Sequence, residues 1–296
     1  MNDPASRPWR LYLLLVLVMF IWALNFIATK VALKEIPGAL LSGFRLTLAA
    51  IFLIPVFRWA KKKDGKTWNF ADGWRMALLG SIGIAANQVF FILGLSRTTV
   101  SHAAFIFGLV PLAVLLLASA MGHEAIQPRK ISGILLALCG VATLQLRAST
   151  GGHGPSTAGD LMIIASALTF ACYIVFGKGL VASHGPFIPT TFAFFSGAVT
   201  LLPMTIYMAS SFDFSKVSLA AWLGVLYMAM FSSVVASLLY YYVLGKLPAS
   251  RVSSFSYLQP LMATALGVTI LGEPVSTALV GGGALILGGV FLTERN

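Results

Sequence analysis

The sequence predicts an all-α integral membrane protein with ten transmembrane helices, arranged as two inverted repeats of five helices each. Composition is the first observation: of 296 residues, 58% are hydrophobic and 10% are charged, far from a soluble domain. The mean hydropathy is +0.90. The second observation is that the apolar residues form ten segments of about 20 residues, the length that crosses a hydrocarbon core. The third is that the chain repeats itself once.

The repeat appears when the sequence is shifted by 148 to 149 positions. Matching residues then include Trp22 and Phe170, Lys30 and Lys178, Pro55 and Pro203, Trp74 and Trp222, Pro111 and Pro260, and Glu124 and Glu273. We therefore expect one repeat over residues 1–148 and a second over 149–296. Because five crossings is an odd number, the second repeat inserts upside down. Inverted pairs of this kind build many secondary transporters, with a site where the halves meet.

The expected spans follow the apolar segments in order. They are 11–33, 37–57, 74–95, 101–121, 129–146, 160–182, 187–209, 218–243, 250–271 and 275–293. Charge supports them, because long stretches such as 76–96 and 217–245 contain no Asp, Glu, Lys or Arg. The second span is the exception, since it contains Arg45. The two longest loops are expected at 58–73, which is basic, and at 147–159, which joins the halves.

Lysine and arginine counts predict the orientation. With the N-terminus in the cytoplasm, 14 of the 20 basic residues fall on the cytoplasmic side and 6 on the other. Cytoplasmic loops carry such an excess, so both termini are expected in the cytoplasm. The net charge of +11 therefore indicates membrane topology and no nucleic-acid partner. The two cysteines, Cys139 and Cys172, lie inside apolar segments and form no spaced pair, so no metal, disulfide or cofactor is expected.

Glycine and proline predict how the helices pack and bend. Gly133 and Gly140 in the fifth span, and several glycines in the tenth, give small faces that let helices approach closely in lipid. Proline inside a helix removes a backbone donor and produces a kink. The candidate kinks or hinges are Pro55, Pro111, Pro203 and Pro260.

Polar and aromatic side chains at membrane depth are the candidate binding residues, because polar groups there usually face the bundle interior or a water-filled cavity. The candidates are Trp22, Asn25, Asn87, Gln88, Phe91, His102, Phe105, Tyr173, Tyr241, Tyr257 and Gln259. Tight helix packing is the alternative for the polar face that holds Asn87 and Gln88. A hydrogen-bonded helix end is the favoured alternative for His102.

All nine acidic residues are expected in loops or at helix ends. A proton-coupled carrier usually needs a buried carboxylate, so the expected cargo is neutral or zwitterionic. Arg45 is the one charge well inside a span. It could snorkel to the interface, pair with Glu35 or Glu273, or bind a substrate carboxylate. A structural role is favoured over binding.

Several motifs resemble those of the drug/metabolite transporter superfamily. They are Trp22-x-x-Asn25, Arg45-Leu46, Pro111 followed by Gly122-His123-Glu124, and the echo at Pro260 and Gly272-Glu273-Pro274. From end to end the chain looks like the ten-helix branch with two EamA-type repeats. The resemblance implies an exporter of small metabolites in a bacterial inner membrane, similar to the YddG-type exporters of aromatic and other amino acids. The buried first-helix glutamate of the four-helix multidrug members is missing here.

These inferences predict a secondary transporter that exports zwitterionic amino acids with aromatic or apolar side chains by alternating access. The cavity is expected between spans 1, 3 and 4 of one half and 6, 8 and 9 of the other. The expected partners are a small-molecule substrate and membrane lipid, with the chain a monomer or a weak homodimer. Three alternatives stay open: a carrier for nucleotide sugars, other metabolites or drugs, a passive channel, and a membrane enzyme acting on lipids. The scattered histidines argue against an enzyme.

Overall fold

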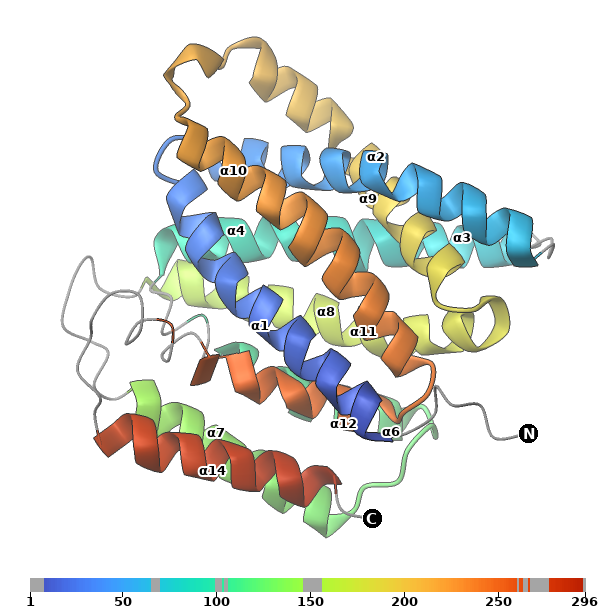
Figure 1. The fold of residues 1–296 in the computed structure, drawn as a ribbon, viewed down its shortest axis with the longest axis vertical. Helices are drawn as coiled ribbons and strands as arrows, with labels where there is room; N and C mark the ends of the chain where they lie inside the picture. The colour runs from blue at the N-terminus through green and yellow to red at the C-terminus, as the bar shows by residue number, and fades with distance from the viewer. Residues whose placement is uncertain are drawn as a thin grey trace.

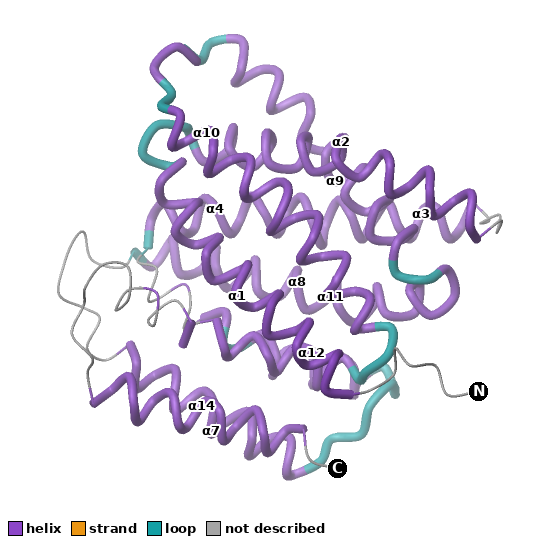
Figure 2. Tube along the Cα trace, viewed as in Figure 1, coloured by secondary structure: helices purple, strands orange, loops and turns teal. Residues whose placement is uncertain are grey.

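A computed structural model describes residues 8–64, 70–98, 103, 106–145, 156–259, 261–262, 266 and 277–294. Every regular element within these residues is helical (Figures 1 and 2). The predicted all-α class is therefore confirmed.

The elements of the first half follow the expected spans. They are α1 (Pro8–Ala32), α2 (Gly38–Asp64), α3 (Phe70–Leu78), the π-helical η2 (Leu79–Ala86), α4 (Asn87–Arg97), α6 (Val110–Ala120) and α7 (Pro128–Gln145). The second half contains α8 (Thr157–His184), α9 (Phe187–Ser210), the short η3 (Phe214–Lys216), α10 (Leu219–Tyr227), the π-helical η4 (Met228–Val235), α11 (Ala236–Leu244), α12 (Ala249–Ser254), η5 (Phe255–Tyr257) and α14 (Thr277–Glu294).

Among the described residues, six helical rods are long and apolar enough to cross a membrane. They are Trp9–Leu33, Gly38–Lys62, Phe70–Arg97, Thr157–His184, Phe187–Ser210 and Leu219–Leu244. Val110–Ala120 and Val280–Thr293 are shorter apolar helices. The expected loop over 58–73 is wrong at both ends, because α2 continues to Asp64 and α3 begins at Phe70. Lysine is a good helix former, and its long stem lets a helix extend beyond the apolar region.

The two halves interlock helix by helix. The expected counterparts pack together in the pairs α2 with α9, α6 with α12, and α7 with α14. Further contacts also cross between the halves: α1 packs against α10 and α11, and α4 packs against α8. In Figure 1, α1 crosses in front of the bundle beside α10 and α11, and α7 and α14 lie together at its lower edge. This exchange is what a duplicated architecture predicts.

Glycines set the closest of these contacts. A Cβ at Gly133 would lie 2.8 Å from the carbonyl oxygen of Gly289, and one at Gly140 would lie 2.6 Å from the carbonyl oxygen of Gly282. Real Cβ atoms do not approach backbone this closely, so the α7–α14 contact requires residues without side chains. The predicted role of these two helices as packing elements is confirmed.

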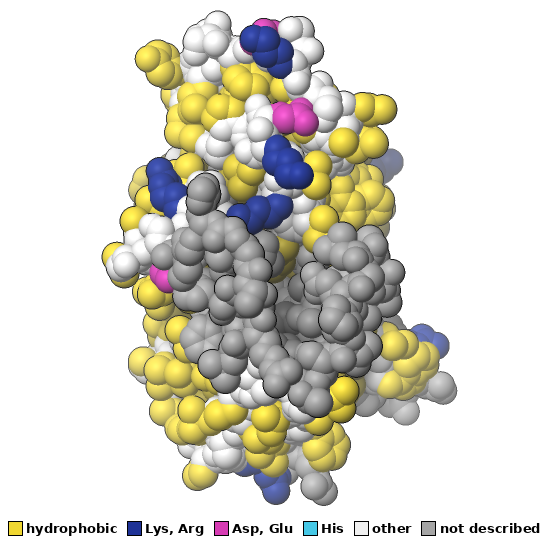
Figure 3. All heavy atoms as spheres, turned by 90° about the vertical axis from the view of Figure 1, so that its left-hand side faces the viewer, with side chains coloured by type: hydrophobic (Ala, Val, Ile, Leu, Met, Phe, Trp, Pro, Cys, Tyr) yellow, Lys and Arg dark blue, Asp and Glu magenta, His cyan; other side chains and the backbone are white. Residues whose placement is uncertain are grey.

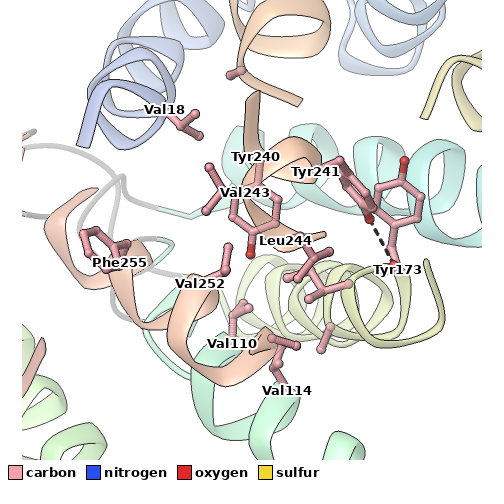
Figure 4. Close-up of a cluster of buried hydrophobic side chains, with 14 of the residues drawn as sticks. Val18, Val110, Val114, Tyr173, Tyr240, Tyr241, Val243, Leu244, Val252 and Phe255 are labelled. Atoms are coloured by element: carbon pink, nitrogen blue, oxygen red, sulfur yellow. Dashed lines mark hydrogen bonds between the residues drawn. The ribbon is translucent and has the colours of Figure 1, made fainter. Parts of the chain in front are cut away.

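The main buried cluster lies where α1, α6, α8, α11 and α12 meet. Figure 4 shows Val18, Val110, Val114 and Val252 converging there. Tyr241 joins two elements of the second half, because its hydroxyl donates a hydrogen bond to the backbone oxygen of Tyr173 at 3.0 Å (Figure 4).

The prolines divide into two kinds. Pro55 lies inside α2 and Pro203 inside α9, at matching positions of the two halves. Pro111 stands in the first turn of α6, so its expected place inside a helix is wrong. Proline is tolerated in a first turn because no intrahelical donor is needed there. Pro260 lies outside the described residues.

The described surface is hydrophobic along the rods and charged at their ends. Exposed apolar side chains include Leu13, Ile51, Leu161, Val199 and Phe291. Figure 3 faces the end at which α4 stops and α8 starts, and shows basic and acidic side chains among hydrophobic ones. At this end Lys34, Glu35, Arg97, Asp213 and Lys216 are exposed. At the other end Arg58, Lys61, Lys62, Arg75, Arg129 and Lys246 are exposed.

Candidate functional site

A cavity lies between the two halves and draws its wall from both. It contains about 750 Å³ of empty space, part of it open to solvent. Its described lining consists of Trp22, Asn25, Phe26, Arg45, Ile84, Asn87, Gln88, Phe91, Phe107, Phe170, Tyr173, Phe194, Ser232, Ser233, Ser237, Tyr240, Tyr241, Ser256 and Gln259. A site where repeats meet is the expected location in a transporter built from two halves.

Most of the residues singled out from sequence come together here. Trp22, Asn25, Arg45, Asn87, Gln88, Phe91, Tyr173, Tyr241 and Gln259 all line the cavity. Tyr257 is not among the lining residues, and its side chain is buried in the main hydrophobic cluster. Its hydroxyl finds no hydrogen-bond partner among the described residues. His102 and Phe105 lie outside the described residues.

Aromatic rings from both halves form the apolar wall. The ring of Trp22 lies 5.7 Å from that of Phe170 and 5.2 Å from that of Tyr240, measured between centroids. Phe91 and Phe107 lie edge to face at 5.4 Å. These distances are typical of favourable aromatic pairs.

Asn87 is already engaged in holding the halves together. Its side-chain nitrogen donates to the backbone oxygen of Ser166 at 2.8 Å and to the Ser166 hydroxyl oxygen at 2.9 Å. The Ser166 hydroxyl donates back to the backbone oxygen of Asn87 at 3.1 Å. Asn87 therefore joins the two halves through Ser166 and also lines the cavity.

Two other amides keep unused acceptors. The side-chain oxygens of Asn25 and Gln88 are buried and accept no hydrogen bond from the described residues. Gln259 makes one weak contact, since its side-chain nitrogen lies 3.5 Å from the sulfur of Met19. Buried polar atoms are normally hydrogen-bonded, so two free acceptors in one cavity indicate a place for donors.

Arg45 forms the charged part of the wall. It is 4% exposed, and it donates from Nε to the Ser233 hydroxyl at 2.8 Å and from Nη2 to the Ser232 hydroxyl at 3.0 Å. Trp22 steadies the same region, because its indole nitrogen donates to the backbone oxygen of Ser232 at 3.1 Å. Arg45 therefore does not snorkel to the interface. It reaches from α2 of the first half to η4 of the second.

Two carboxylates of the first half bind helix starts of the second half, one at each end of the bundle. Glu124 accepts hydrogen bonds from the backbone N–H and hydroxyl of Ser250, and forms a salt bridge with Lys130 at 2.9 Å. Burial acts to raise the pKa of Glu124, but these hydrogen bonds and the Lys130 ammonium outweigh burial, so the pKa is lowered.

Glu35 accepts hydrogen bonds from the backbone N–H and the hydroxyl of Ser218, and these bonds lower the pKa of Glu35. Glu35 therefore does not pair with Arg45.

Sequence reasoning missed part of the wall. The residues that it left out are Phe26, Ile84, Phe107, Phe170, Phe194, Ser232, Ser233, Ser237, Tyr240 and Ser256. The repeat was a usable signal for Phe170, because this residue matches Trp22. Serines in membrane helices usually bond to their own backbone, so nothing marked Ser232 and Ser233 as partners of an arginine. Among the described residues, no group of three His, Cys, Asp or Glu side chains could hold a metal ion.

The fold and cavity define a multi-pass membrane protein of the transporter class. The model of the EamA-like transporter family matches the chain twice, over residues 9–145 and 157–295. The chain therefore belongs to the EamA-like transporter family. The two matches correspond to the two halves recognised from the repeat.

Three relatives match over nearly the whole chain. The "Uncharacterized transporter YetK" of Bacillus subtilis is 28% identical over 95% of this chain and 86% of its own length. The "Probable terminal-alkyne amino-acid exporter" of Streptantibioticus cattleyicolor is 29% identical, covering 95% of this chain and 92% of the relative. The "Probable amino-acid metabolite efflux pump" of Salmonella typhimurium is 26% identical, covering 94% and 93%.

Proposed function

We propose that this transporter exports zwitterionic amino acids with aromatic or apolar side chains across the bacterial inner membrane by alternating access. One observation carries the proposal: the cavity between the halves combines an aromatic wall with uncharged amides, hydroxyls and one arginine. An apolar side chain suits the rings, and the backbone groups of an amino acid suit the polar part. The names of two relatives, a probable amino-acid exporter and a probable amino-acid metabolite efflux pump, agree with this cargo.

The proposed mechanism exposes the cavity to each side of the membrane in turn. In transporters built from two repeats, one repeat rocks against the other around a fixed site. Here the cavity wall comes from both halves, so such movement would open it on one side and close it on the other. Pro55 and Pro203 lie inside helices at matching positions and are the candidate hinges. A ligand can shift this equilibrium only by binding the two states differently.

The proposed orientation places the Lys61 end in the cytoplasm. The exposed charges at that end are mainly basic, whereas the α4 end carries basic and acidic side chains side by side. The distribution agrees with the excess of lysine and arginine on cytoplasmic loops. Export is then movement from the Lys61 end to the α4 end. Both chain termini would lie in the cytoplasm.

A carrier for nucleotide sugars or other anionic metabolites is the alternative. Such cargo carries two or more negative charges and would favour several basic groups in the cavity. The described lining contains one, Arg45. This favours a cargo with a single carboxylate.

Counterflow in proteoliposomes tests the proposal. Vesicles are loaded with unlabelled amino acids, nucleosides, nucleotide sugars or cationic drugs, and labelled phenylalanine is offered outside with no ion gradient. We expect uptake to be stimulated by internal phenylalanine and leucine and by neither nucleosides nor drugs. Labelled UDP-glucose, offered in parallel, serves as the tracer for the alternative. Exchange of that tracer without amino-acid exchange would contradict the proposal.

A further inference from the structure

Arg45 is a buried cation whose third nitrogen is unused. Nε and Nη2 donate to the two serines, but Nη1 is buried and has no acceptor among the described residues. Serine hydroxyls orient a guanidinium without neutralising its charge. An unpaired charge at membrane depth is costly, and such residues usually mark a ligand pathway. Within the part of the chain that the structure describes, Arg45 therefore has no anion beside it.

The described carboxylates are engaged elsewhere. Asp72 pairs with His184 and Arg75, Asp213 with Lys216, and Glu124 with Lys130. Asp160 accepts a hydrogen bond from Thr98, and Glu35 accepts two from Ser218. None of these carboxylates forms an ion pair with Arg45. Glu273, the other expected partner, lies outside the described residues.

Helix packing does not require the arginine. Two equivalent contacts join the halves: α2 of the first half packs on η4 of the second, and α9 of the second half packs on η2 of the first. The offsets of 148 and 149 place Ala193 or Phe194 at the position of Arg45. In that contact Gly197 and Gly80 approach closely without any charged side chain. Because the equivalent contact forms without a cation, helix packing alone does not account for the presence of Arg45.

The rest of the cavity complements a zwitterion. The free side-chain oxygens of Asn25 and Gln88 are acceptors, and an ammonium group has three N–H donors. The free Nη1 of Arg45 is a donor, and a carboxylate is its natural acceptor. Donor and acceptors line the same cavity as the aromatic wall. A molecule that carries a carboxylate, an ammonium and an apolar side chain has the groups that complement this donor, these acceptors and the aromatic wall.

We propose that Arg45 binds the α-carboxylate of the cargo, held in place by Ser232 and Ser233, and that Asn25 and Gln88 receive its ammonium. This inference rests on the proposed function and adds its specificity: the free carboxylate is required. A primary amine without a carboxylate, or an amino-acid amide, is rejected.

The test compares substrate analogues in counterflow. Wild-type vesicles are loaded with L-phenylalanine, L-phenylalaninamide, phenethylamine or N-acetyl-L-phenylalanine, and labelled L-phenylalanine is offered outside. We expect each analogue to stimulate uptake at least tenfold less than phenylalanine. If the amide drives exchange as well as phenylalanine, the inference fails while the proposed function stands. If no amino acid exchanges, both fail.

A substitution assigns the carboxylate to Arg45. Arg45→Gln should reduce phenylalanine exchange at least tenfold while exchange of labelled phenylalaninamide stays unchanged or rises. The matched control is Arg97→Gln, at an exposed arginine that donates to the backbone of Leu93. Equal loss of acid and amide exchange in Arg45→Gln, or wild-type discrimination in that variant, would overturn the assignment. Should the variant fail to fold, labelled phenylalanine and phenylalaninamide binding to the wild type decides, with equal affinity contradicting the inference.

Discussion

The two halves build two equivalent helix contacts, and they differ in charge. Where α2 meets η4, Arg45 is held by two serine hydroxyls. Where α9 meets η2, Ala193 lies against Gly80 and Gly197 lies against Gly80 and Ile84. The π-helical segments agree in length and register, since η2 covers Leu79–Ala86 and η4 covers Met228–Val235, an offset of 149. The backbone is thus repeated while the chemistry of the cavity wall is not.

This difference separates two uses of charge in the molecule. Glu124 and Lys130 are paired with each other and tie the loop after α6 to the start of α12. Arg45 has no paired anion among the described residues. We therefore expect changes at paired charges to alter stability and changes at Arg45 to alter substrate selection.

The largest expected effect is on the contact between η2 and α9, which contains no charged side chain. A Cβ at Gly80 would overlap the backbone oxygen of Ala193, which cannot move away as a side-chain end can. Gly80→Ala should destabilise by about 1–3 kcal/mol through overpacking and lower Tm by roughly 2–5 °C. Thermal unfolding of the detergent-purified protein measures this. Gly179→Ala is the control, because no atom lies within 4 Å of the added Cβ. Equal Tm values for both variants would contradict the close contact.

The second effect concerns the paired charge. Glu124→Gln should lose about 1–3 kcal/mol, the usual range when a charged hydrogen-bonding group is removed, and leave the preference for phenylalanine over its amide intact. Glu35→Gln should lose less, because Glu35 is exposed. Unfolding in denaturing detergent compares the two. A changed preference between phenylalanine and its amide in Glu124→Gln would contradict the expectation that paired charges affect stability and not substrate selection.

The same residue predicts a pH dependence. The pKa of Glu124 is lowered in the folded protein, so its contribution to stability is present above its ordinary pKa of 4.5 and is lost as pH falls through the lowered value. Wild-type Tm should therefore fall more than that of Glu124→Gln when the pH is taken below about 4.5. Parallel curves for the two proteins would show that the carboxylate contributes nothing.

A smaller effect is expected from the serines that hold Arg45. The double variant Ser232→Ala with Ser233→Ala removes both hydroxyls that accept hydrogen bonds from the Arg45 guanidinium. The guanidinium is then no longer held in one orientation. We expect phenylalanine exchange to fall about tenfold, equal to about 1.4 kcal/mol, with the amide unaffected. Ser96→Ala is the control, since this exposed serine bonds only the backbone of Leu93. Unchanged exchange in the double variant would show that the serines do not position Arg45.

The smallest effect is predicted for Tyr257. Its hydroxyl is buried without a partner in the described structure, and Tyr257 is not among the residues that line the cavity. Tyr257→Phe should leave exchange within about twofold of wild type, since an unpaired buried hydroxyl contributes no stabilising bond. Loss of exchange in this well-folded variant would return Tyr257 to the binding residues.

Much of the fold could be predicted because lipid imposes simple rules on sequence. Of the ten spans expected from apolar length, six are long apolar helices within the described residues, and the glycines of α7 and α14 marked the close contact of these two helices. The extension of α2 to Asp64 was missed because loss of hydrophobicity was taken as the end of the helix. The π-helical register of η2 and η4 depends on tertiary packing and leaves no clear periodic pattern.

The site was harder to predict because membership in a cavity depends on which helices face each other. Gln88 and Asn87 are adjacent in sequence, yet only Asn87 bonds Ser166 across the halves. Tyr257 and Tyr241 look alike in sequence, yet only Tyr241 lines the cavity. The partners of Arg45 lie 187 and 188 residues away along the chain, a distance at which no local pattern can connect them.

An experimental structure with bound L-phenylalanine is the most direct measurement. We predict that the carboxylate lies about 2.7–2.9 Å from Arg45, that the ammonium faces the oxygens of Asn25 and Gln88, and that the ring lies against Trp22 and Phe170. A ligand bound with its ammonium toward Arg45, or one bound elsewhere while a protein carboxylate pairs with Arg45, would contradict the assignment of this arginine to the cargo.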